Sequence, residues 1–169
     1  MYSFQQTLCC VSASIGLLLA PPAMAQEVPK EGPVDFVVTT TGEATILAAS
    51  QGTMQLNYEV IGMRDTLESG VNGVASLHCV GAASVFDGKF DNESGLCRTT
   101  YPDGSTTVIR YGGAGILGST AEGKWSFIGG TGTFAGITGG GAYSRISGPP
   151  PRENSFASRN TVTGNYELP

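Results

Sequence analysis

The segment WSFIGGTGTFAGITGGGAY, from Trp125 to Tyr143, constrains the fold more than any other part of the chain. Aromatic and β-branched residues alternate there with small or polar ones, and glycines recur at short intervals. Alternation with a period of two is typical of strands, whereas one face of a helix repeats every three or four residues. The segment therefore predicts β-strands that are joined by tight turns.

The first 25 residues differ in character from the rest of the chain. An apolar run extends from Leu8 to Ala20 and is followed by two prolines and the tripeptide Ala23-Met24-Ala25. This pattern predicts a secretory signal peptide that is cleaved between Ala25 and Gln26. The run is too short to cross a bilayer, which takes about 20 residues. We therefore expect a secreted or periplasmic protein that leaves the membrane once the signal is removed.

The remainder of the chain is predicted to form a flexible lead-in over residues 26–33 and a single domain over residues 34–169. Its 14 acidic and nine basic residues give a net charge of −5. An acidic chain gains nothing from phosphate backbones and is repelled by anionic lipids. Nucleic acids and membrane surfaces are therefore not expected as partners.

Signal cleavage removes Cys9 and Cys10 and leaves only Cys79 and Cys97. Two cysteines in an oxidising compartment predict a disulfide. A reactive thiol or a metal ligand is the alternative. If the chain folds back at residues 87–89, Phe86 lies opposite Phe90 and Cys79 lies opposite Cys97, so the disulfide and the hairpin predict each other.

Further strands follow from alternation and turn residues. They are predicted at residues 34–40, 53–60, 74–86, 96–101, 105–111, 120–128, 142–146 and 161–168, with a weaker apolar stretch at 44–49. Gly42 is expected to break the first strand, residues 112–118 to form a loop, residues 139–141 to form a bend, and residues 147–160 to form a long connection. The last strand can pair with the first and close the sheet. Seven to nine strands with glycines at the corners predict an all-β fold, an antiparallel barrel with about eight strands.

The motif from Trp125 to Tyr143, together with His78-Cys79-Val80-Gly81 and Asp87-Gly88-Lys89, resembles the bacterial allene oxide cyclase barrel-like proteins. Its Gly-Gly-Thr-Gly-x-Phe core is also similar to one in dirigent proteins. The resemblance covers residues 74–143 and implies an eight-stranded barrel with an apolar interior, which is trimeric in many plant members. It implies confinement of a reactive guest without a cofactor. Several of the bacterial proteins carry Asp-Gly-Asp in the second hairpin, where this chain has Asp103-Gly104-Ser105.

The sequence identifies no catalytic residue. His78 is expected to be a strand residue beside the disulfide, and a single histidine argues against a zinc site. Asn57 and Glu59 share the strand face opposite Tyr58 and are expected to lie in solvent. No phosphate-binding loop follows from Gly130-Thr131-Gly132, because neither a lysine nor a helix comes after it.

The acidic residues of the first hairpin are expected to be solvated; a calcium site is the alternative, although the ligand spacing of the known loop is absent. This acidic loop contains Asp87, Asp91, Asn92 and Glu93.

Four aromatic residues are the candidates for the wall of a ligand cavity: Tyr58, Trp125, Phe127 and Phe134. The leading hypothesis is a barrel that binds a small apolar molecule or serves as a structural module, with no metal or cofactor. A cofactor-free cyclase or isomerase of allene oxide cyclase type is the second hypothesis, and an oligomerising interaction module, for example a trimer, is the third. A cavity of about 300 Å³ or more with an inward carboxylate would favour the cyclase.

Overall fold

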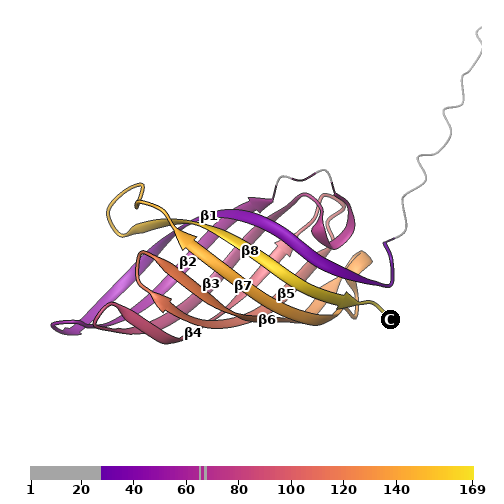
Figure 1. The fold of residues 1–169 in the computed structure, drawn as a ribbon. Helices are drawn as coiled ribbons and strands as arrows, with labels where there is room; N and C mark the ends of the chain where they lie inside the picture. Colours follow the sequence, from indigo (N-terminus) through magenta and orange to yellow (C-terminus); the bar gives the residue numbers. More distant parts are fainter. Residues whose placement is uncertain (1–27, 65, 67) are drawn as a thin grey trace, which may run out of the picture.

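The computed structural model describes residues 28–64, 66 and 68–169, so the predicted signal peptide and its cleavage site lie outside the described residues. Eight antiparallel strands form one closed barrel (Figure 1). The strands are β1 (Glu31–Ser50), β2 (Thr53–Arg64), β3 (Ala75–Phe86), β4 (Lys89–Thr100), β5 (Thr106–Ile116), β6 (Thr120–Thr131), β7 (Thr138–Ser147) and β8 (Ser155–Glu167). The predicted all-β, eight-stranded antiparallel barrel is confirmed.

The barrel is closed by the pairing of β8 with β1, as the alternation near the C-terminus predicts. Phe36 lies opposite Val162 at the centre of this pair. Each strand also pairs with its neighbours in the chain. Together with the β1–β8 pair, this leaves the sheet without a free edge. Two short 3-10 turns, η1 (Gly70–Asn72) and η2 (Gly132–Phe134), lie in connections at one end of the barrel. Over the described part of the chain, no helix is both long and apolar enough to span a membrane.

The predicted disulfide joins Cys79 of β3 to Cys97 of β4. The two residues are direct cross-strand partners, with their Cα atoms 4.0 Å apart. Both cysteines are buried inside the barrel. The pairing deduced from the hairpin is therefore confirmed.

The first strand is longer than predicted. Strand β1 begins at Glu31, inside the predicted lead-in, and it continues through Gly42 without a break. Gly42 is required for space, because a Cβ atom there would lie 2.6 Å from the ring of Phe156 on the neighbouring strand β8. The glycine was wrongly interpreted as a breaker, since its role is to admit an inward aromatic ring.

Other glycine-rich segments are also strands rather than loops. Residues 112–116 belong to β5 and residues 139–141 belong to β7. Strand β8 begins at Ser155, so only residues 148–154 connect it to β7. Inward tyrosines explain part of this pattern, since a Cβ at Gly113 would lie 3.1 Å from the Cζ atom of Tyr143. Glycine inside these strands marks a close approach of a large side chain.

The two ends of the barrel differ. The end that carries η1 and η2, here called the base, is filled by a buried cluster that includes Val71, Tyr101, Phe134 and Ile137. The opposite end, here called the mouth, is formed by the three hairpin turns and the β7–β8 connection. A packed base and a less filled mouth place the candidate site inside the barrel.

Candidate functional site

A cavity of about 110 Å³ lies inside the barrel. Every strand contributes inward side chains, and most of them are apolar. Its wall includes Val34, Val38, Val60, Ile109, Trp125, Phe127 and Val162. The volume is below the 300 Å³ that we set for a lipid-like guest, and it is close to the roughly 150 Å³ of an apolar cavity that accepts benzene. A guest in this cavity must therefore be small.

Three of the four predicted aromatic residues line this cavity, namely Tyr58, Trp125 and Phe127. The indole of Trp125 is fixed, because its N–H donates to the carbonyl oxygens of Ala142 at 3.1 Å and Thr163 at 3.2 Å. The ring of Phe127 meets it edge to face, with the ring centroids 5.1 Å apart. These contacts hold the aromatic wall rigid.

The fourth predicted residue, Phe134, lies elsewhere. It is buried in η2 at the base, and its ring is 4.3 Å from that of Tyr101, measured between the centroids. It therefore helps to close the base but does not line the cavity.

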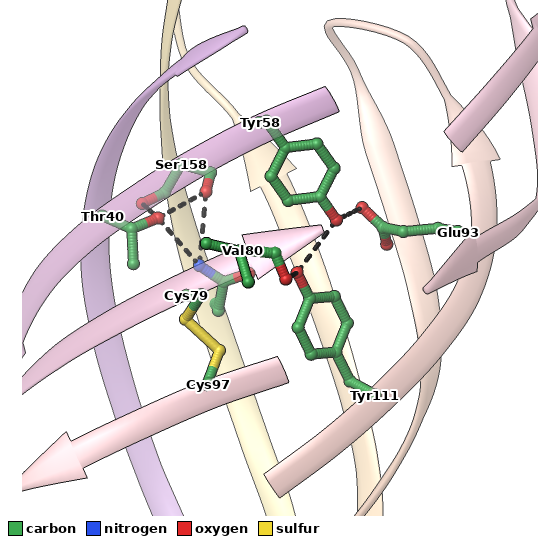
Figure 2. Close-up of a disulfide and its surroundings, with 9 residues drawn as sticks. Thr40, Tyr58, Cys79, Val80, Glu93, Cys97, Tyr111 and Ser158 are labelled. Carbon is green, nitrogen blue, oxygen red and sulfur yellow. Dashed lines mark hydrogen bonds between the residues drawn. A yellow bond between two sulfur atoms is a disulfide. The ribbon is translucent and has the colours of Figure 1, made fainter. Parts of the chain in front are cut away.

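A buried carboxylate stands at the centre of a polar cluster inside the barrel. Glu93 of β4 is only 4% exposed. Its Oε1 accepts hydrogen bonds from Tyr58 at 2.8 Å and Arg145 at 2.9 Å. Its Oε2 accepts from Tyr143 at 2.7 Å and Arg145 at 3.1 Å. Figure 2 shows the hydroxyl of Tyr58 between Glu93 and Tyr111, beside the disulfide.

Glu93 faces inward because β4 contains a bulge. Phe86 pairs with Lys89 rather than with Phe90, so the register deduced for this turn was wrong by one residue. The register shifts between Phe90 and Glu93, where β4 carries one residue more than its partner strands, and this restores the pairing of the cysteines. The extra residue makes both Phe90 and Glu93 point inward. The prediction that Glu93 is solvated is therefore wrong.

Space for the tyrosines is provided by glycine in β3. A Cβ atom at Gly81 would lie 2.5 Å from the hydroxyl oxygens of both Tyr58 and Tyr111. These two oxygens are 3.0 Å apart. Tyr58 donates its single proton to Glu93, so Tyr111 is the donor to Tyr58. The result is a chain of hydrogen bonds that ends on the carboxylate.

Burial keeps the phenols of this cluster neutral. It raises the pKa of Tyr111 to about 12. Burial is also the main cause that raises the pKa of Tyr58 and of Tyr143, and the charge of Glu93 adds to it in both. The pKa of Arg145 is raised as well: burial alone would lower it, but the Glu93 carboxylate outweighs burial. The cluster is thus a charged pair surrounded by neutral hydroxyl groups.

A second, wider pocket of about 430 Å³ opens at the mouth. It shares Tyr58, Arg145 and Phe156 with the inner cavity, and Glu93 also lines it. The polar cluster therefore forms a layer between the mouth pocket and the inner cavity.

The remaining predicted polar residues lie outside the barrel. Asn57 and Glu59 are exposed, as expected. His78 also lies on the outer surface, where its Nε2 is 2.6 Å from Glu59 Oε1. Among the described residues, no group of three potential metal ligands comes together. His78 and the other hairpin acids, Asp87 and Asp91, are exposed and do not reach the cavity.

Asp103 has a structural role in the turn between β4 and β5. Its carboxylate accepts hydrogen bonds from the backbone N–H and the hydroxyl of Ser105, and from the hydroxyl of Thr133 in η2. The Ser105 hydroxyl is the main cause of a lowered pKa at this carboxyl. The Ser105 hydroxyl also accepts a hydrogen bond from the backbone N–H of Thr133, so this serine ties the turn to η2 at the base.

Four members of the polar cluster were not identified from the sequence: Glu93, Tyr111, Tyr143 and Arg145. Tyr111 lies directly opposite Trp125, and Arg145 follows Tyr143 by two residues. Side chains alternate between the two faces of a strand, and this rule, applied along each strand, would have placed Tyr111, Tyr143 and Arg145 inside the barrel. Glu93 gives no consistent signal, because the bulge makes its phase counted from Phe90 differ from its phase counted from Cys97.

Comparisons with known proteins add little to this geometry. No protein-family model matches the sequence, and no curated protein is significantly similar to it. Among solved structures, a pterocarpan synthase dirigent protein is similar with a TM-score of 0.45 and 10% sequence identity, over 89% of this chain and 98% of the other. The resemblance to allene oxide cyclase barrel-like proteins stays a prediction. The geometry of the site is therefore the only basis for a proposed function.

Proposed function

We propose that the protein binds a small apolar molecule inside the barrel and does no chemistry on it. The observation that carries this proposal is the cavity of about 110 Å³, whose wall is mainly apolar and is held rigid around Trp125. Concave apolar sites with a few fixed polar groups are the usual form of small-molecule sites. The disulfide supports action in an oxidising compartment, in agreement with the predicted export signal.

The state of the polar cluster favours binding over catalysis. Both oxygens of Glu93 accept two hydrogen bonds each, so no lone pair is left for the proton of a guest. The nearby phenols have a raised pKa, so they stay protonated at neutral pH and no phenolate is available as a base. The hydrogen bonds and protonation states of the cluster are therefore expected to stay the same when a guest binds.

A cofactor-free cyclase or isomerase is the second candidate, and the mouth pocket is the observation that favours it. This pocket has about 430 Å³ and an inward carboxylate, Glu93. A test is the rate of ring closure of a fatty-acid allene oxide with the wild-type protein and with Glu93→Gln. A rate equal to that in buffer for both proteins eliminates this candidate.

The binding proposal can be tested through the chain's one tryptophan, Trp125, which lines the cavity. We expect butanol to change its fluorescence in a saturable manner. Val38→Phe places a larger side chain in the cavity wall and should weaken binding at least tenfold. Val37→Phe, on the outer face of the same strand, is the matched control and should bind as the wild type does. A wild-type fluorescence that does not respond, or equal binding by both variants, contradicts the proposal.

A further inference from the structure

A second arginine lies inside the barrel, at the base. Arg64 is the last residue of β2, is only 2% exposed and lines the inner cavity. Its Nη1 donates to the carbonyl oxygen of Val71 at 2.7 Å. The ring of Phe36 lies 4.1 Å from its Cζ atom, measured to the ring centroid, and that of Tyr101 lies at 5.5 Å. The guanidinium is therefore held in one orientation.

Two nitrogen atoms of this guanidinium have no hydrogen-bond partner in the described structure, namely Nε and Nη2. The ion pairs among the described residues do not include Arg64, and the inward carboxylate of Glu93 is paired with Arg145. A buried cation with unpaired donors is costly unless an anion meets it. Within the described ranges, the buried guanidinium at the base of the cavity thus has no anionic partner.

The unpartnered atoms also define the shape of the missing anion. Nε and Nη2 lie on one edge of the guanidinium and form a fork that matches the two oxygens of a carboxylate. We propose that Arg64 binds the carboxylate of a small monocarboxylic acid whose apolar body occupies the inner cavity. This inference rests on the proposed binding function and specifies the class of ligand.

The cavity restricts the size of the acid. A volume of about 110 Å³ is below the roughly 150 Å³ that accommodates benzene in an apolar protein cavity. An acid of about four carbons, such as butanoate, matches this space, because the three carbons beyond its carboxylate occupy less volume than benzene, whereas a long-chain fatty acid exceeds it. Its alkyl chain would contact the apolar wall that includes Val38, Val60 and Trp125.

The test compares butanoate with its neutral analogue butanamide, using the oxidised wild-type protein at pH 7. We expect butanoate to bind at least tenfold more tightly, as measured by Trp125 fluorescence. It should also shift the Nε–H resonance of Arg64 in ¹H–¹⁵N NMR spectra, since that group would donate to the carboxylate. Arg64→Met should remove the preference and bind both compounds equally. Arg98→Met, on the outer face of β4, is the matched control and should keep the preference.

The outcomes separate this inference from the proposed function. If the wild-type protein binds both compounds equally and the Arg64 resonance does not move, the carboxylate site is refuted while the binding barrel stands. If neither compound nor butanol binds, both proposals fail. The wild-type comparison decides the matter even if Arg64→Met does not fold.

Discussion

The buried pair of Glu93 and Arg145 offers the strongest test of the site as described. Glu93→Gln preserves the shape of the side chain but removes its charge and replaces one acceptor with a donor. The new NH₂ group would face either the guanidinium of Arg145 or a tyrosine hydroxyl. Both of these groups donate hydrogen bonds to the carboxylate in the wild-type protein, so two donors would meet. The substitution therefore leaves a buried cation without its anion.

The expected loss in the free energy of unfolding follows from the burial of Glu93 and Arg145. Removing one partner of a buried ion pair costs about 3–5 kcal/mol. The side chain of Glu93 is 3% exposed and that of Arg145 is 17% exposed, so water can still reach the arginine in part. We therefore expect a loss of about 3 kcal/mol in the free energy of unfolding.

The assay is urea unfolding of the oxidised protein, followed by Trp125 fluorescence. Glu122→Gln on the outer face of β6 is the control, and it should stay within about 0.5 kcal/mol of the wild type. The double variant Glu93→Leu with Arg145→Met should recover most of the loss, because an apolar pair can replace a buried ion pair at little cost. A Glu93→Gln protein within about 1 kcal/mol of the wild type would refute the account of the cluster.

Three further predictions concern the same interior. Replacing both Cys79 and Cys97 with alanine should lower the free energy of unfolding by about 3 kcal/mol, because the disulfide closes a loop with a sequence separation of 18; equal stability with and without reductant would contradict this. Burial raises the pKa of Tyr58 and Tyr111, so the folded state holds these protons more tightly than the unfolded state does. Stability should thus be complete below about pH 10 and fall above it, and urea unfolding across this range should show a shallower fall for Tyr111→Phe. Gly81→Ala should destabilise the barrel by about 1–3 kcal/mol, since the new methyl group would meet both tyrosine hydroxyls; unchanged urea unfolding would show that the rings can move aside.

The fold could be predicted from the sequence because its signals are local. Alternation over residues 53–60 and 120–128 identifies half-buried strands, and the Asp87-Gly88 turn identifies the hairpin that joins Cys79 to Cys97, although the bulge in β4 is also needed to pair them. Glycine was the main source of error. A glycine in a strand that leaves space for a ring, such as Gly42, looks in the sequence like a glycine that ends a strand. Only the residue across the sheet distinguishes them.

The centre of the site could not be predicted, and the reason is the bulge in β4. Strand phase propagates from residue to residue, so one additional residue reverses the side on which every later side chain points. Counted back from Cys97, which points inward, Glu93 has the inward phase, whereas counted forward from Phe90 it has the outward phase. The two counts agree only if an extra residue lies between Phe90 and Glu93. Once the disulfide and the inward Phe90 are both accepted, the bulge and the inward carboxylate follow from them, so the disulfide fixes the phase of the strand segment that carries Glu93.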